Sequence, residues 1–133
     1  MADATVLKSI SNSSNNTERA LSELMGVRGA LGVAIVDYDS GMMLASQGTA
    51  GVLEVAAAAN SEVINAKQRA IKLLGLDDSI DDILVSLTKQ YHLLRPVKAE
   101  KGLFIYYMLD AANANLALAR LKLKTIESEM LFI

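Results

Sequence analysis

The sequence predicts one α+β domain, an α/β sandwich in which helices cover both faces of a five-stranded antiparallel sheet. Three observations predict it: short spacers between strand-like apolar segments, two long stretches of helical periodicity, and a hydrophobic content of 52% in 133 residues. That length suits a single domain with a packed core. The expected order is helix, two strands, long helix, three strands and a final helix, α-β-β-α-β-β-β-α.

The N-terminal segment, residues 1–16, is rich in Ser and Asn, which predicts a flexible tail ahead of a single domain at residues 17–130. Asn16 is a suitable N-cap for a short helix, because its side-chain oxygen can accept from a free backbone N–H group. Gly26 is expected to end this helix.

The next segment, residues 30–37, is apolar on both of its alternating faces, which predicts an interior strand covered by helices on both sides. A cluster of turn residues at 37–41 then connects it to a second strand at residues 42–47. The two strands are expected to form a β-hairpin.

Residues 51–74 have the longest helical pattern, and Gly75 is expected to end it. One apolar stripe contains Leu53, Ala57, Ile64, Ile71 and Leu74, widened by Ala56, Val63 and Ala70. Four small residues, 56–59, permit another backbone to approach closely. Two interpretations stay open at this point: tight packing on the helix's own sheet, or contact with another helix.

Three short strands are predicted at residues 83–87, 91–96 and 103–109, and their short connections require antiparallel neighbours. Pro96 places its strand end at an edge or a rim. The final helix is expected at residues 116–130, capped by Asn113 or Asn115. Its apolar stripe contains Leu116, Ala119, Leu123, Ile126 and Met130.

Composition argues against several classes of function. A formal charge of −2 and a pI near 5.3 give no electrostatic reason to expect a nucleic acid or an anionic membrane as partner. The chain has no Cys and one His, so thiolate chemistry and zinc sites are not expected. Neither a signal-peptide pattern nor a long apolar run is present, so the expected compartment is the cytoplasm.

No catalytic, cofactor-binding or metal-binding residue is predicted, and the chain is not expected to be an enzyme. The glycines at 26, 29 and 32 match no phosphate-binding spacing, and they precede a strand. His92 is interpreted as a structural or surface residue because no partner motif surrounds it. The acidic residues at 77–82 predict either a solvated loop or a surface for a weakly bound cation or a basic partner.

Two segments resemble the roadblock (dynein light chain) family, in particular its bacterial, MglB-type branch. The predicted hairpin GALGVAIVDYDSGMMLASQG is similar to the first strand pair of that family, with one extra residue in its turn. The segment LDAANANLALARLKLKTIESEM is similar to the last strand and helix, where an N-x-x-L-A-R-x-x-L/I stretch is matched by Asn115, Leu118, Ala119, Arg120 and Leu123. The resemblance covers residues 17–128.

The resemblance implies a profilin-like fold and a dimeric regulator or scaffold that modulates or localises a Ras-like small GTPase. It also implies a dimer formed through the long helix and an edge strand. The alternative is a small-molecule-sensing or adaptor module of a signalling complex. We expect the interface to include Leu53, Ala56, Ala57, Ala59, Asn60, Ile64, Ile83, Val85 and Leu87.

Overall fold

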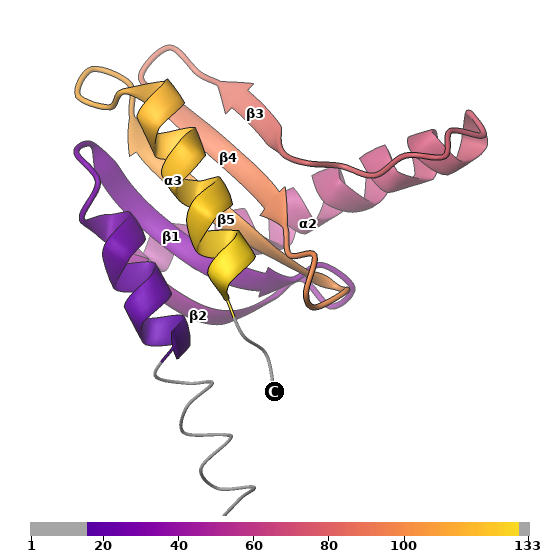
Figure 1. Ribbon diagram of the computed structural model, residues 1–133, viewed down its shortest axis with the longest axis horizontal. Helices are drawn as coiled ribbons and strands as arrows, with labels where there is room; N and C mark the ends of the chain where they lie inside the picture. The colour runs from indigo at the N-terminus through magenta and orange to yellow at the C-terminus, as the bar shows by residue number, and fades with distance from the viewer. Residues whose placement is uncertain (1–15, 131–133) are drawn as a thin grey trace, which may run out of the picture.

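The computed structural model describes residues 16–130, and it confirms the predicted five-stranded antiparallel sheet with helices on both faces (Figure 1). The strands lie in the order β2-β1-β5-β4-β3, so β2 and β3 form the two edges. After a helix at residues 16–25, the elements are β1 (Ala30–Asp37), β2 (Met42–Gly48), α2 (Ala50–Leu73), β3 (Ile83–Ser86), β4 (Gln90–Pro96), β5 (Leu103–Asp110) and α3 (Leu116–Glu129).

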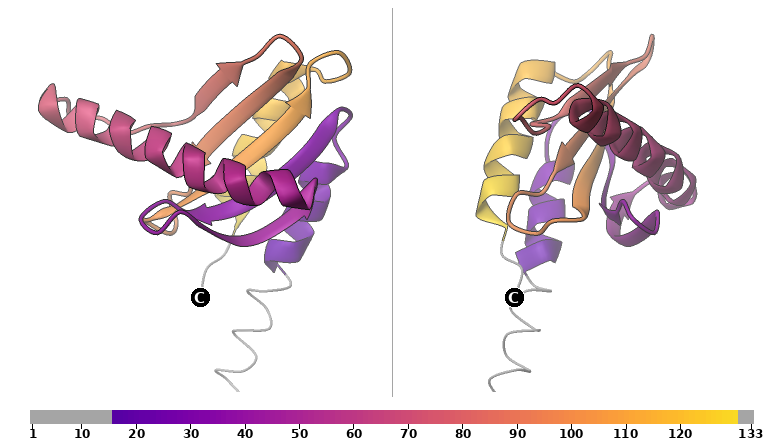
Figure 2. Two further views of the ribbon diagram at one scale, coloured as in Figure 1. Left: turned by 180° about the vertical axis from the view of Figure 1, so that it is seen from behind. Right: turned by 90° about the vertical axis from the view of Figure 1, so that its right-hand side faces the viewer.

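The sheet separates two hydrophobic cores (Figure 2). The helix at residues 16–25 and α3 cover one face, while α2 covers the other. Strand β1 contributes Val33 and Ile35 to the first core and Ala34 and Val36 to the second, because successive side chains of a strand point to opposite faces. The prediction of an interior strand covered on both sides is therefore confirmed.

Local chemistry explains where several elements end. The Asp37 carboxylate accepts from the backbone N–H groups of Asp39 and Ser40, which closes the hairpin turn. Of the two predicted caps of α3, Asn115 is the one used, because its side chain accepts from the N–H of Leu118. Pro96 lies at the end of β4, past Leu94, the last residue that pairs with β3, and so it occupies a rim as predicted.

Several predicted bounds differ from the structure by about one residue, and two of these differences concern a helix cap and the end of a strand. Asn16 is itself helical rather than a cap outside the helix, and the rest of the predicted tail lies outside the described residues. Strand β3 ends at Ser86, because Leu87 already turns to donate its N–H to the Gln90 carbonyl. Within residues 16–130, no helix is both long enough and apolar enough to cross a membrane.

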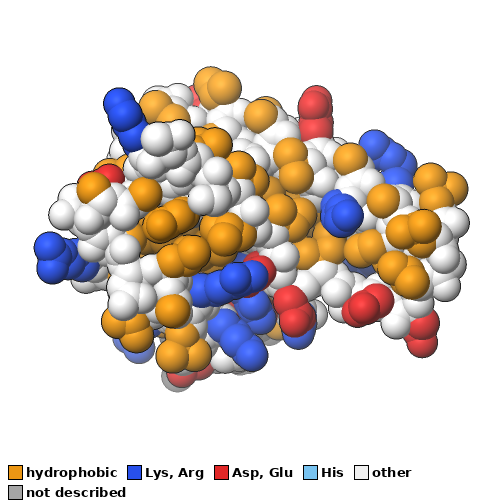
Figure 3. Space-filling model, turned by 90° about the horizontal axis from the view of Figure 1, so that it is seen from above, with side chains coloured by type: hydrophobic (Ala, Val, Ile, Leu, Met, Phe, Trp, Pro, Cys, Tyr) orange, Lys and Arg blue, Asp and Glu red, His pale blue; other side chains and the backbone are white. Residues whose placement is uncertain are grey.

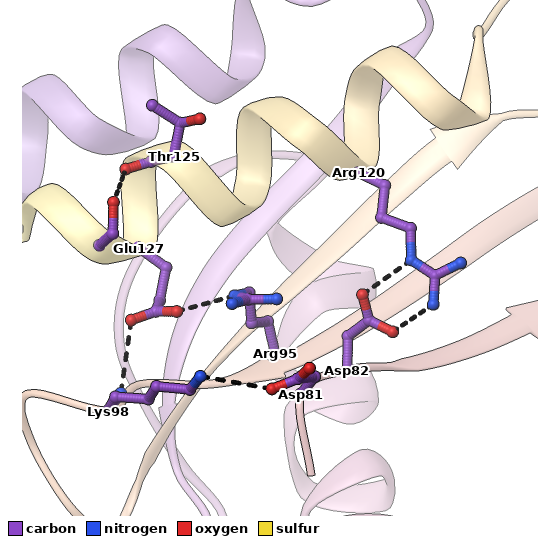
Figure 4. A network of polar contacts seen from close by, with 8 residues as sticks. Asp81, Asp82, Arg95, Lys98, Arg120, Thr125 and Glu127 are labelled. Carbon is purple, nitrogen blue, oxygen red and sulfur yellow. Dashed lines mark hydrogen bonds and ion pairs between the residues drawn. The ribbon is translucent and has the colours of Figure 1, made fainter.

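The acidic loop before β3 is tied to this chain's own cations (Figure 4). Asp82 accepts two hydrogen bonds from Arg120 of α3, at 2.8 and 2.5 Å, and these bonds lower the pKa of the Asp82 carboxyl. Asp81 pairs with Lys98 at 3.3 Å. Between residues 16 and 130 the structure contains no group of acidic or His side chains that could hold a metal ion. Two carboxylates of the loop thus form ion pairs within the chain, and of these two Asp81 remains largely exposed.

A buried ion pair that was not predicted from the sequence lies beside this loop (Figure 4). The Arg95 Nε donates to Glu127 at 2.7 Å, and the two side chains are only 5% and 3% exposed. The second carboxylate oxygen of Glu127 accepts from the backbone N–H of Lys98 at 3.4 Å. The pair joins α3 to β4 in the interior of the fold (Figure 4).

Candidate protein interface

Helix α2 carries two apolar stripes, and only one of them is fully buried against the sheet. The inner stripe contains Leu53, Ala57 and Ile64, all fully buried. At 100° per residue, a second apolar stripe lies along another side of the helix. We call it the outer stripe; it consists of Val52, Val55, Ala56, Ala59, Val63, Ala66, Ala70, Leu73 and Leu74.

The outer stripe is largely open to solvent. Val55 is 72% exposed and Val52 is 50% exposed, although both are large hydrophobic residues. A contiguous exposed apolar surface of this kind is typical of a protein–protein contact. The outer stripe is therefore the strongest candidate for a functional surface in the described chain.

A groove of about 680 Å³ runs between the outer stripe and the uncovered part of the sheet. One wall is α2 and the other is formed by β4 and β5. None of the residues that line the groove carries a formal charge when His92 is neutral. They are Leu31, Thr49, Gly51, Val52, Val55, Ala56, Ala59, Asn60, Gln90, His92, Tyr106 and Met108. A partner that fills this groove must therefore present apolar side chains.

The floor of the groove has a short hydrogen-bonded chain of three side chains. Tyr106 Oη lies 3.0 Å from His92 Nδ1, and Gln90 Oε1 lies 2.8 Å from His92 Nε2. Because the Gln90 oxygen can only accept, the ring hydrogen is assigned to Nε2, and Nδ1 accepts from the Tyr106 hydroxyl. Burial lowers the pKa of His92 and raises the pKa of Tyr106 to about 12, so both groups are uncharged at neutral pH.

The C-terminal part of α2 projects past the sheet beyond the edge strand β3 (Figures 1 and 2). The last side chain of α2 that the sheet buries completely is Ile64, although the helix continues to Leu73. Here Leu73, Leu74 and Leu76 are 87%, 71% and 54% exposed. Figure 3 shows hydrophobic side chains gathered at this projecting end.

The predicted interface residues fall into three groups. Leu53, Ala57 and Ile64 are core residues in contact with their own sheet, so they have no surface to offer a partner. The groove brings together Ala56, Ala59 and Asn60. Near the edge, Ile83 lines a second hollow with Val63, Ala66 and Lys67, Val85 is half-buried on β3, and Leu87 is 46% exposed just after that strand.

The two interpretations of the small residues at 56–59 have different outcomes: packing on the helix's own sheet is observed for Ala57, and contact with another helix stays a prediction. Ala57 packs on the sheet, while Ala56 and Ala59 line the open groove. Ala58 lies beside the hairpin turn: a Cβ atom added to Gly41 would be 3.6 Å from the Cα of Ala58. Val52, Val55 and Leu73 also belong to this surface and were not predicted. The signal available for them was their spacing of three and four residues from Ala56, Ala59 and Ala70.

Comparison with solved structures identifies the fold. Myxococcus xanthus MglB superimposes with a TM-score of 0.76 at 19% sequence identity, over 86% of this chain and 84% of that one. A roadblock/LC7 domain from Streptomyces avermitilis gives a TM-score of 0.72 at 14% identity, over 83% and 90% of the two chains. This chain has the roadblock fold.

A third roadblock-fold structure, described as MglB with tetrameric arrangement, gives a TM-score of 0.68 at 20% identity, over 90% of this chain and 92% of that one. The sequence itself matches no protein-family model and no curated protein. The predicted roadblock fold is confirmed, and at these identities the likeness concerns the fold.

Proposed function

We propose that this chain is a non-catalytic, self-associating platform of the MglB type that modulates or localises a Ras-like small GTPase in the cytoplasm. The observation that carries the proposal is the outer stripe of α2, which is apolar, exposed and continuous with the projecting end of the helix. The GTPase follows from the resemblance of the hairpin and the last helix to bacterial roadblock proteins. Nucleic acids and membranes are not partners in this proposal.

The geometry at the β3 edge of the sheet favours a second copy of the chain as the first partner. Strand β3 has an unpaired edge, and α2 extends across and past that edge. A two-fold axis beside β3 would pair the two β3 strands and place the projecting end of each α2 over the open groove of the other subunit. Leu73 and Leu74 of each copy would then meet the apolar groove lining near Val52 and Val55.

Self-association gives the first prediction. We expect a mass of two chains of 14.2 kDa each at micromolar concentration, and we expect Val55→Asp to be monomeric. Burying an unpaired carboxylate costs several kcal/mol, and each 1.4 kcal/mol weakens association about tenfold. Sedimentation velocity measures both chains. The matched control is Met42→Asp, at a 64% exposed position on the opposite edge strand, which should remain dimeric.

A wild-type chain that sediments as a monomer throughout the micromolar range would rule out the self-association. Equal weakening by Val55→Asp and Met42→Asp would place the contact somewhere other than the outer stripe.

The role toward a GTPase needs its own experiment. Small GTPases from the source organism, loaded with GDP or a non-hydrolysable GTP analogue, are tested for binding to the wild-type chain and to Val55→Asp. We expect binding that depends on the nucleotide and on the dimer. Accelerated GTP hydrolysis would indicate a regulator of hydrolysis, whereas binding with an unchanged rate would indicate an adaptor. Absence of binding in both nucleotide states contradicts the proposal.

The groove also supports a second candidate function, the sensing of a small apolar molecule within a signalling complex. Its apolar walls and the polar floor of Gln90, His92 and Tyr106 are features of ligand pockets. Such a ligand and a second subunit would compete for the same space. Loss of dimer on addition of an environment-sensitive apolar dye, with saturable binding, would favour this function.

A further inference from the structure

We infer that His92 makes self-association pH-dependent, so that the dimer forms while His92 is neutral and dissociates as this residue takes up a proton. The inference rests on the proposed self-association through the groove. It starts from a feature of composition: His92 is the one histidine of the chain, and the structure places it on the floor of the groove that the second copy would cover.

The hydrogen bonds around His92 suit the neutral ring. Nδ1 accepts from Tyr106, and Nε2 donates to Gln90. Protonation adds a hydrogen at Nδ1, where the Tyr106 hydroxyl now donates. Tyr106 is fully buried, so its hydroxyl must turn its own hydrogen away in the same confined space and become an acceptor.

The surroundings supply no negative charge to balance an imidazolium. From α2, the residues that line the groove are apolar apart from Asn60, and the charged residues Glu62 and Lys67 lie further along the helix, outside the groove lining. From β3, the residue opposite His92 is Val85. From β5, the titratable neighbour is Tyr106, which burial keeps protonated.

The carboxylate at the end of β5 is engaged elsewhere. Asp110, at the end of β5, pairs in register with Gln90 and not with His92, and its carboxylate accepts from Ala112 and Asn113 in the following turn. On β4 itself, Arg95 points to the opposite core, where it pairs with Glu127. The helix at residues 16–25 and α3 cover that opposite core as well.

A second copy would make this environment less favourable for a charge. The outer stripe that it brings is apolar, and the two charged side chains that border it on α2, Glu62 and Lys67, are of opposite sign. Covering the groove removes the water that now reaches His92, and desolvation already lowers its pKa in the single chain. The pKa of His92 is therefore lower in the dimer than in the monomer.

The direction of the pH effect follows from this difference. Above the ordinary histidine pKa of about 6.5, His92 is neutral in both the monomer and the dimer, and the dimer is at its most stable. Below the lowered pKa of the monomer, the monomer binds protons that the dimer excludes, so the dissociation constant rises as the pH falls. A dimer has two copies of His92, and the limiting effect is about a hundredfold per pH unit, about tenfold from each copy.

The test measures the dimer dissociation constant by sedimentation between pH 8.0 and pH 5.0, over the pH values at which the far-ultraviolet circular dichroism of each chain is unchanged. We expect the constant of the wild-type chain to rise at least tenfold across this range. The matched variant is His92→Gln, which keeps hydrogen-bonding groups but does not titrate. Its constant should change by less than about twofold, whatever its value at pH 8.0.

The outcomes separate the two proposals. A wild-type dimer whose constant does not change with pH overturns the role of His92 and leaves the self-association standing. If the His92→Gln chain retains the wild-type pH dependence, the effect comes from carboxylates, and the proposed role of His92 is also overturned. A chain that is monomeric even at pH 8.0 overturns the self-association on which the inference rests.

Discussion

Replacing Ile35 with Asp is expected to leave the chain unable to fold. Ile35 is 2% exposed, lies in β1 between two other strands, and belongs to the core covered by α3. An unpaired carboxylate at this position costs several kcal/mol, which is comparable with the about 5–15 kcal/mol that stabilise an ordinary domain. Thermal melting followed by circular dichroism measures the effect.

The matched control is Leu44→Asp, the same kind of change on the neighbouring strand β2, where the side chain is 56% exposed. This variant should melt close to the wild-type chain, because substitutions at exposed positions usually change stability by less than about 0.5 kcal/mol. His92→Ala should also fold. If Ile35→Asp melts cooperatively near the wild-type temperature, the interior position of β1 is wrong.

The second large effect is expected at the buried ion pair. Glu127→Ala should destabilise the fold by about 3–5 kcal/mol, because it leaves the Arg95 guanidinium buried without its partner. The backbone N–H of Lys98 loses its acceptor in the same change. Urea unfolding of the two chains, analysed for the midpoint and the slope, gives the difference in free energy of unfolding.

Two further variants separate the pair itself from the cost of breaking it. Asp81→Ala removes an exposed ion pair with Lys98 and should cost less than about 1 kcal/mol. The double change Arg95→Met with Glu127→Leu replaces the pair by apolar side chains and should recover most of the loss. A double variant as unstable as Glu127→Ala would show that the ion pair is itself a net source of stability.

The strands were predictable from the sequence because their signal is local. Alternation within residues 30–37 identified a strand buried on both faces, and the two cores confirm it. The short connections among β3, β4 and β5 allowed only antiparallel pairing, which the registers confirm. Short segments with clear turn residues at both ends determined these elements almost without reference to the rest of the chain.

The interface was less predictable, since periodicity does not say what covers an apolar helix face. The sequence grouped Val63 and Leu74 with Leu53 and Ile64 in one stripe, but only the last two are buried by the sheet. Deciding between the stripes requires the angle at which α2 crosses the strands, and this angle is a property of the assembled fold. The Arg95–Glu127 pair joins residues 32 apart, so no local pattern indicates it.

The projecting end of α2 divides the helix into two parts with different local stability. Its last turn is closed by local bonds alone, from Gly75 N–H to the Lys72 carbonyl and from Leu76 N–H to the Ile71 carbonyl, with Gly75 at a φ of +68°. A helix end that the sheet does not cover opens more often than the core, so its amides should exchange rapidly with deuterium in dilute, monomeric chain and slowly at dimeric concentrations. The length of ordered helix that extends past the sheet would then depend on the concentration of the protein itself. A partner that competes for the outer stripe would be detected as a return of fast amide exchange at residues 70–76.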